Sequence, residues 1–310
     1  MIQRVIRRFV LASMVLWLGA CASSLQTRLL DASPPDIPPM VELEAVPFHA
    51  QTAYHCGPAA LAGILNYRGV AVTPDEIARL VYVPGLKGSL QVEIAAATRQ
   101  HGMLAISMDG QLESLLRELD AGNPVFVLHN LALDAWPQWH YETLIGYDLA
   151  RGHMILRSGE DRRVTRDIAV FEKTWQRADH WALVIIEPGS IPASVGSHAY
   201  LDAVMAMEQV GRVADAQAGY AAATARWPDS SLAFAGLGNT HFALGDFEAA
   251  ETAYRAALAR DPNRAGLWNN LAYALARQGL RDASLEAVGR AMAIEPQNPD
   301  YRESLAELSR

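Results

Sequence analysis

Cys56 is the residue of this chain best suited to nucleophilic chemistry, because the residues after it predict that it opens a helix. Gly57 and Pro58 follow it, and proline is favoured in the first turn of a helix, where its missing N–H has no partner to lose. The free amides and positive end of that helix would stabilise a thiolate. We therefore expect Cys56 to have a lowered pKa and to act as a nucleophile. The alternative is a small buried side chain of the core.

Two other residues could complete such a site. His140 opens an apolar run of strand length, and a neutral imidazole there could take the proton of Cys56 and later protonate a leaving amine. Gln51 precedes Cys56 and could offer its side-chain amide, beside the Cys56 backbone N–H, to the oxyanion of a tetrahedral intermediate. This chemistry needs no cofactor. The other histidines lack the spacing of metal ligands, so we expect no metal site.

The elements that must position these residues are predicted as helices first and strands later. A capping box from Thr73 to Glu76 marks the start of one helix. This order of elements predicts an α+β domain in which a helical half packs against an antiparallel sheet. The expected helices are 57–67, 75–81, 90–101 and 111–120, and the expected strands are 124–129, 140–147, 153–157, 164–168 and 181–187.

Two segments, Gln51 to Ala62 around Cys56 and His140 to Asp148, together resemble the double-glycine, bacteriocin-processing cysteine peptidases. The resemblance is closest to the stand-alone relatives that lack a transporter. It implies a papain-like fold over residues 46–188 and hydrolysis of a peptide bond. It also implies that Cys56 is the nucleophile, His140 the general base and acid, and Gln51 the oxyanion residue.

The chain departs from this family at the partner of the histidine. Relatives place an aspartate, followed by proline, at the end of the strand after the histidine strand, whereas this chain has Leu156-Arg157-Ser158-Gly159 there. The hydroxyl of Ser158 could accept the N–H bond of the imidazole and orient it without charge. Asp161 lies three residues further on and could reach His140 only if the chain folds back. We therefore expect Ser158 to be the orienting residue.

A 34-residue period fills the C-terminal third of the chain. Prolines, glycines, aromatic residues and small residues recur on this interval, which is typical of stacked helical hairpins. The pattern resembles the tetratricopeptide repeat, with copies at about 197–230, 231–264 and 265–298 and a partial capping helix up to residue 310. We expect an all-α domain with the aromatic residues in its core, separable from residues 46–188, that binds a protein partner. The recurring positions are Pro228, Pro262 and Pro296; Gly211, Gly245 and Gly279; Tyr200, Phe234 and Trp268; and Ala216, Ala250 and Ser284.

The N-terminus has the pattern of a bacterial lipoprotein signal. Residues 1–20 contain three arginines and no acidic residue, followed by an apolar run too short to span a bilayer stably. The run ends Leu18-Gly19-Ala20-Cys21, which resembles a lipobox and implies acylation of Cys21. We expect a membrane anchor, with Ala22 after the cysteine favouring the outer membrane and a periplasmic orientation. Residues 21–45, rich in proline, are expected to form a tether.

Composition indicates which kinds of partner and of covalent cross-link to expect. The chain has 26 basic and 34 acidic residues and no cluster of Lys or Arg in its body, so nucleic acid is not expected as a partner. Its two cysteines each have a separate explanation, so we expect no disulfide. The prediction is a membrane-anchored cysteine peptidase. The alternatives are a catalytically weak peptide-binding module on a repeat scaffold, or a thiol amidase or acyltransferase acting on wall peptides.

Overall fold

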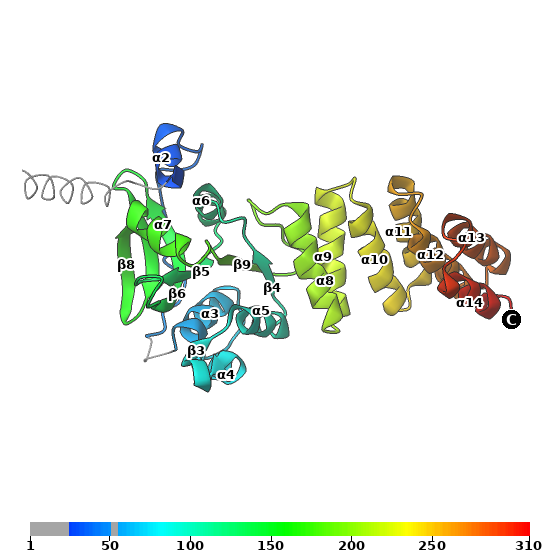
Figure 1. The fold of residues 1–310 in the computed structure, drawn as a ribbon, viewed down its shortest axis with the longest axis horizontal. Helices are drawn as coiled ribbons and strands as arrows, with labels where there is room; N and C mark the ends of the chain where they lie inside the picture. Colours follow the sequence, from blue (N-terminus) through cyan, green and yellow to red (C-terminus); the bar gives the residue numbers. More distant parts are fainter. Residues whose placement is uncertain (1–24, 51–54) are drawn as a thin grey trace, which may run out of the picture.

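The computed structural model describes residues 25–50 and 55–310, so Cys21, Gln51 and the predicted signal peptide lie outside the described residues. An α+β domain is followed by a row of helices that ends at the C-terminus (Figure 1). This confirms the predicted fold class. Within the described residues, no helix combines the length and apolar composition that crossing a bilayer requires.

The α+β domain is built on an antiparallel sheet with the strand order β4-β9-β5-β6-β7-β8, and β1 pairs with the second half of β6. Alternate residues of β5 point to opposite faces of this sheet, as strand geometry requires. The strands are β1 Met40–Glu42, β4 Leu104–Ser107, β5 Val125–Asn130, β6 Trp139–Asp148, β7 His153–Ser158, β8 Asp161–Asp167 and β9 Ala182–Ile186.

Helices cover both faces of the sheet, which gives three layers (Figure 1). On one face, Phe126 and Leu128 of β5 pack with α3, α4 and α5. On the other face, Val125 and Val127 pack with α6 and α7. A two-stranded ribbon, β2 Tyr82–Val83 and β3 Gly88–Ser89, adjoins the α3 layer. The helices are α3 Cys56–Tyr67, α4 Pro74–Val81, α5 Gln91–Gln100, α6 Leu112–Asp120 and α7 Ile168–Gln176.

Local signals at helix ends account for two boundaries. The predicted capping box is confirmed, because Thr73 Oγ1 accepts from Glu76 N and Glu76 Oε2 accepts from Thr73 N. The strand expected at 164–168 overlaps the longer strand β8, which ends at Asp167, so the predicted end at residue 168 is wrong by one residue. The Asp167 side chain accepts hydrogen bonds from Ala169 N and Val170 N, and so caps the unpredicted helix α7.

The tether predicted for residues 21–45 is wrong for its described part. Leu25–Ala32 forms helix α2, which contacts α6 and α7, and β1 joins the sheet. The reason lies at the start of α6, whose own N-cap residue makes no side-chain capping bond. Gln26 supplies one instead: its Oε1 accepts from Leu112 N at 2.6 Å, and its Nε2 donates to Gly110 O at 3.0 Å. This segment is therefore part of the domain.

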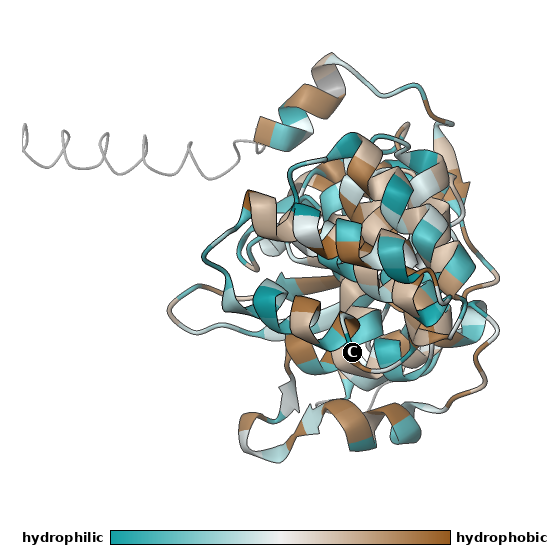
Figure 2. Ribbon diagram, turned by 90° about the vertical axis from the view of Figure 1, so that its right-hand side faces the viewer, coloured by the Kyte–Doolittle hydropathy of each residue, from teal (hydrophilic) through white to brown (hydrophobic). Residues whose placement is uncertain are grey.

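The repeat domain consists of three helical hairpins and a last helix. Gly211, Gly245 and Gly279 have φ of +82°, +84° and +80°, which explains their 34-residue spacing: each ends the first helix of a hairpin in the left-handed region. The helices are α8 Ser197–Gln209, α9 Val213–Arg226, α10 Ser231–Ala243, α11 Phe247–Arg260, α12 Ala265–Arg277, α13 Arg281–Ile294 and α14 Pro299–Leu308. Figure 2, which looks along the row from its C-terminal end, shows hydrophilic and hydrophobic residues side by side on these helices, as expected for amphipathic helices.

The three aromatic residues that recur at 34-residue spacing in the first helix of each hairpin, Tyr200, Phe234 and Trp268, differ in how deeply they are buried. Tyr200 is fully buried, whereas Phe234 and Trp268 are only partly buried. The prediction that these aromatic residues lie in the core is therefore confirmed fully for Tyr200, while Phe234 and Trp268 pack against the edge of the core. Small residues let neighbouring helices pack closely in this domain. At Gly236, for example, an added Cβ would lie 2.2 Å from the ring of Tyr220, so only glycine fits there.

The two domains share a hydrophobic core, so they are not independent units. Leu104 and Ile106 of β4 pair with Ile186 and Val184 of β9, and all four pack against α8 and α9. Two polar contacts also join the domains: Ser194 donates to Glu118 Oε1, and Arg212 donates to Gln100 O. The expectation of a separable repeat array is corrected by this apolar interface.

Candidate active site

Cys56 is the first residue of α3, which starts one residue before the helix predicted at 57–67, and this helix end meets the start of β6. The two elements pack so closely that a Cβ on Gly57 would lie 3.3 Å from the ring of Tyr141. The backbone amide of Tyr141 is also hydrogen-bonded to the Cys56 thiol. Cys56 is partly buried and is a free cysteine. The nucleophile candidate thus lies next to the residue that follows His140.

Burial changes the expected ionisation of this thiol. It raises the pKa of Cys56, and the backbone amides of Tyr141, Gly57 and Cys56 itself only partly oppose it. The sequence prediction of a lowered pKa is therefore wrong. It counted the amides of the helix end but not the removal of the thiol from water, which disfavours the thiolate.

His140 lies near the start of β6 and is held by the next strand. Its Nε2 is 3.0 Å from Ser158 Oγ, at the end of β7. Ser158 is buried, whereas Asp161, opposite it on β8, is exposed. Of the two residues considered as partners of His140, the structure thus brings Ser158 to the ring. Because Nε2 is engaged with Ser158, Nδ1 is the nitrogen left for the thiol.

The imidazole is also partly removed from water. Burial lowers the pKa of His140, Glu142 opposes that change and Arg166 adds to it. The shifts of Cys56 and His140 both disfavour a thiolate–imidazolium pair. At rest the two groups are therefore a neutral thiol and a neutral imidazole.

A buried ionic cluster lies behind His140. Glu142 is fully buried and accepts hydrogen bonds of 2.6 and 2.9 Å from Arg166. Its Oε1 lies 3.8 Å from His140 Nε2, and its Oε2 lies 3.4 Å from His129 Nε2. His129 is held on its other side by Thr174, whose Oγ1 is 2.8 Å from Nδ1, and burial lowers the pKa of His129 to about 4.

The sequence analysis missed this cluster, although a signal was present. Glu142 is the one acidic residue in the otherwise apolar stretch Tyr141 to Gly146, and it lies two residues after His140. In a strand, residues at this spacing share a face. A buried carboxylate beside the predicted base could therefore have been expected.

The segment 131–139, which joins β5 to β6 and leads into His140, exposes apolar side chains. Trp136 is 79% exposed, Trp139 54% and Leu133 65%, so these side chains do not belong to the core. The loop is nonetheless ordered by Asn130, whose Oδ1 accepts from the backbone amides of Ala132 and Gln138. Exposed apolar side chains on an ordered segment that leads into the base candidate are suited to contact with a peptide.

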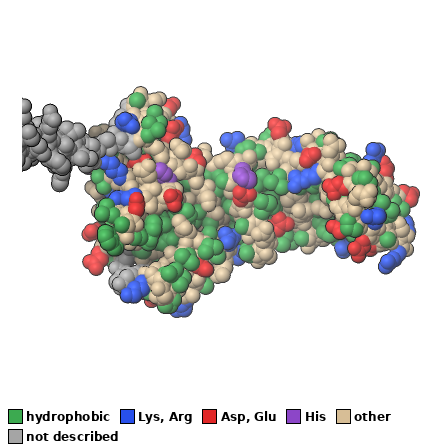
Figure 3. Space-filling view, viewed as in Figure 1, with side chains coloured by type: hydrophobic (Ala, Val, Ile, Leu, Met, Phe, Trp, Pro, Cys, Tyr) green, Lys and Arg blue, Asp and Glu red, His purple; other side chains and the backbone are tan. Residues whose placement is uncertain are grey.

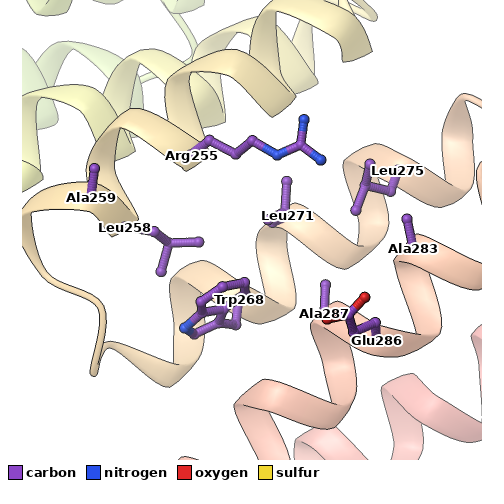
Figure 4. A pocket seen from close by; sticks show the side chains of 9 residues that line it. All are labelled: Arg255, Leu258, Ala259, Trp268, Leu271, Leu275, Ala283, Glu286 and Ala287. Atoms are coloured by element: carbon purple, nitrogen blue, oxygen red, sulfur yellow. The ribbon is translucent and has the colours of Figure 1, made fainter.

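The repeat domain has a pocket of about 390 Å³ between α11, α12 and α13 (Figure 4). Its floor is apolar, with Trp268 and Leu271 among the labelled side chains, and Arg255 and Glu286 bring opposite charges to its edges. Figure 3 shows acidic and basic side chains mixed over the visible face of this domain. Residues 25–50 and 55–310 contain no group of three or more His, Cys, Asp or Glu side chains arranged to hold a metal ion.

Comparison with known proteins agrees with both domains. The Peptidase_C39 like family model matches residues 43–182, and the Tetratricopeptide repeat model matches residues 201–254 and 236–302. No curated protein is similar enough in sequence to count as a relative.

Solved structures match each domain separately. One described as a C39-like peptidase from Bacillus anthracis is 19% identical, with a TM-score of 0.41, and the match covers 48% of this chain and 98% of that chain. The second tetratricopeptide domain of human RPAP3, in complex with an HSP70 peptide, is 17% identical over 37% of this chain and 99% of that one, with a TM-score of 0.36. The Yersinia enterocolitica chaperone SycD, in complex with a YopD peptide, is 20% identical over 36% and 86%, with a TM-score of 0.34. The family matches therefore show that the chain contains a Peptidase_C39-like domain at residues 43–182, followed by tetratricopeptide repeats within residues 201–302.

Proposed function

We propose that this protein is a cysteine peptidase in which Cys56 attacks a peptide carbonyl and His140 acts as general base and then general acid. The observation that carries the proposal is the position of Cys56 at the N-terminus of α3, beside the start of β6, with the His140 ring held through Nε2 by Ser158. A nucleophile, a base and a residue that orients the base are the parts that this chemistry requires.

In the first half of the reaction, the Cys56 proton moves to His140 Nδ1 as the sulfur bonds to the carbonyl carbon. The neutral resting pair means that this transfer accompanies attack. The tetrahedral oxyanion would be stabilised by the Cys56 backbone N–H at the helix end and by the side-chain amide of Gln51, a role proposed from the family resemblance. His140 then protonates the leaving amine, which leaves an acyl-thioester on Cys56.

In the second half, His140 takes a proton from water as the water oxygen attacks the thioester. Collapse of the intermediate releases the new carboxylic acid, and the proton returns to the Cys56 sulfur. The exposed Trp136 and Trp139, on the segment that leads into His140, would contact apolar side chains of the substrate. No cofactor takes part in this scheme.

The repeat domain would hold a protein or peptide partner. Stacked helical repeats present extended binding surfaces, and the pocket around Trp268 offers an apolar site edged by both charges. Acylation of Cys21 would hold the protein in the bacterial envelope, at the outer membrane and facing the periplasm. The support for this anchor is the sequence pattern of residues 1–21.

One observation favours a second candidate, a catalytically weak peptide-binding module. Burial raises the pKa of Cys56 and lowers that of His140, so the thiol is held away from its reactive thiolate and the imidazole is a weaker base. Such a protein would keep the loop and the repeats for recognition and would turn over slowly or not at all.

Labelling with a peptidyl vinyl sulfone separates the two candidates. A peptidase should be labelled at one site, and Cys56→Ala should abolish both labelling and the release of new peptide termini from the envelope proteome. A wild-type protein that binds the probe reversibly without reacting would support the binding module. Transfer of the acyl group to an amine instead of water, seen by product analysis, would point to an acyltransferase.

The anchor is tested separately. Radiolabelled fatty acid should enter the wild type and not Cys21→Ser, while Cys56→Ser should be labelled like the wild type. Equal labelling of wild type and Cys21→Ser would remove the anchor from the proposal.

A further inference from the structure

Glu142 is a buried carboxylate with a position that the family resemblance does not explain. Its side chain is fully buried, and it lies on the same face of β6 as His140. A carboxylate in such a place is strongly destabilising unless it is paired. Glu142 meets this requirement through its two hydrogen bonds from Arg166 of β8.

These bonds keep Glu142 charged. Burial alone would raise the pKa of its carboxyl, but the hydrogen bonds from Arg166 and the nearby cationic groups outweigh it and the pKa is lowered. A permanent negative charge therefore lies 3.8 Å from His140 Nε2. Ser158, at 3.0 Å from the same nitrogen, orients the ring but carries no charge.

We propose that Glu142 is a positioning residue, which supplies from His140's own strand the negative charge that relatives place at the end of the next strand. This inference rests on the proposed peptidase function. The two partners of Nε2 have different roles, since Ser158 fixes the ring and Glu142 stabilises the imidazolium that forms when Nδ1 takes the Cys56 proton.

The other charged or titratable groups around His140 do not supply this negative charge. Arg166 is a cation and acts in the opposite sense, but it is bound to the carboxylate. His129 of β5 is neutral near pH 7, since its pKa is about 4. Cys56 of α3 is a neutral thiol at rest. Glu142 is thus the anion of the described residues that contacts the ring.

The test is Glu142→Gln, with Glu172→Gln as the matched control. Glu172 is also a buried carboxylate of this domain and also contacts a histidine, His180, at 3.2 Å, but it lies on α7 and not beside His140. The titration of His140 is followed by NMR of histidine-labelled protein in a Cys56→Ala background. In a second readout, inactivation by iodoacetamide at pH 7 is measured with Cys56 present.

We expect the pKa of His140 to fall by about one unit or more in Glu142→Gln, since an anion within about 4–6 Å shifts a pKa by this amount. Inactivation should slow by up to about tenfold for each unit by which the pKa of His140 falls, since loss of the same charge also removes a smaller raising effect on the pKa of Cys56. Glu172→Gln should change neither quantity. An unchanged His140 titration in folded Glu142→Gln would overturn the inference, even if activity were lost, because that result would make Glu142 a structural residue.

Glu142→Gln leaves Arg166 without its partner and could unfold the domain. The double variant Glu142→Gln/Arg166→Met removes both charges, and it should still lower the pKa of His140 because Glu142 raises that pKa more than Arg166 lowers it. No change there would also overturn the inference. Both readouts work without a peptide substrate. If the coupling is present but no peptide is cleaved, the proposed function fails while the electrostatic role of Glu142 stands.

Discussion

Two residues assist His140 in different ways: Ser158 orients the ring, and Glu142 is proposed to compensate the charge of the imidazolium. Ser158 contacts Nε2 at 3.0 Å, whereas Asp161, on the neighbouring strand, is exposed. We expect Ser158→Ala to lower kcat/KM by about two- to tenfold, the value of one neutral hydrogen bond of about 0.5–1.5 kcal/mol. Asp161→Ala should have no effect. Steady-state kinetics on any cleaved peptide would check this, and a large loss in Asp161→Ala would mean that the carboxylate partner is Asp161.

His129 makes the stability of the domain depend on pH. The pKa of His129 in the folded state, about 4, lies below its ordinary value of 6.5, so its stabilising contribution is complete above pH 6.5 and is lost as the pH falls toward 4. We expect the free energy of unfolding to fall by on the order of 1–3 kcal/mol through this window. Urea unfolding followed by tryptophan fluorescence at a series of pH values would measure it.

A matched pair of variants isolates this histidine. His129→Asn keeps a donor for Thr174 at the place of Nδ1 but does not titrate, so its stability should vary less between pH 6.5 and 4. His198→Asn changes an exposed histidine of the repeat domain and should keep the wild-type dependence. Equal slopes for all three proteins would show that the acid sensitivity arises elsewhere.

The residues that could be predicted from the sequence are those whose role shows in local order. Cys56 before Gly57-Pro58 indicates a helix start, and Ser158 stands where the family has its aspartate. The pKa of Cys56 could not be predicted, since it depends on burial by strands more than 80 residues away. The contact of Glu142 with Arg166 likewise joins two strands, and no local pattern encodes it.

At the scale of single elements, the glycines within the helices of the repeat domain differ in how much space they leave for a side chain. Gly236 of α10 and Gly289 of α13 both lie inside helices, but a Cβ on Gly236 would clash with the Tyr220 ring, whereas a Cβ on Gly289 meets nothing within 4 Å. We expect Gly289→Ala to stabilise the protein by about 0.5–1 kcal/mol, because glycine is a poor helix former. Gly236→Ala should destabilise it by about 1–3 kcal/mol through overpacking.

Thermal unfolding followed by far-UV circular dichroism would compare the two variants with the wild type. The backbone change is the same in both, so a difference between them reports the space around the glycine. If both variants are stabilised, the helices α9 and α10 must move apart without loss, and the close contact between them would have little energetic weight.

Helices and strands were predicted correctly where a nearby sequence signal, such as a capping residue or a repeat, marks them. They were missed where they form only by contact with a segment far away in the sequence. The helix at Pro74–Val81 follows from its capping box, and the hairpins α8 to α13 follow from the 34-residue repeat. Strand β1 and helix α2 were missed because their partners, β6 and α6, lie many tens of residues away. Proline-rich composition around them favoured a tether, and tertiary contacts overrode that preference.

At the scale of the whole molecule, the first helical hairpin of the repeat domain covers one face of the sheet at its β4–β9 end. Leu104, Ile106, Val184 and Ile186 project from β4 and β9, and α8 and α9 cover them. A change in the first hairpin would therefore be felt by the sheet that carries the active site, and β5 lies directly next to β9. The first hairpin and the sheet thus share one apolar core.

A truncation series tests whether this packing is needed. A chain that ends at Pro188 exposes four apolar side chains, each worth up to about 1.5–3 kcal/mol when buried, a total comparable to the stability of a whole domain. We expect it to aggregate or to melt far below the full chain. A chain that ends at Asp229 keeps α8 and α9 and should retain near-UV circular dichroism and a cooperative transition.

The same four positions offer a rescue that separates exposed apolar surface from missing helices. Ile106→Thr and Val184→Thr face each other across β4 and β9, and both residues are β-branched like threonine, so the sheet should tolerate the change once α8 is absent. In the chain ending at Pro188, this double variant should restore solubility and reduce binding of a hydrophobic dye. In the full chain it should destabilise, because two hydroxyls would then be buried against α8. If the unmodified chain ending at Pro188 melts within a few degrees of the chain ending at Asp229, the shared core contributes little and the two domains are independent after all.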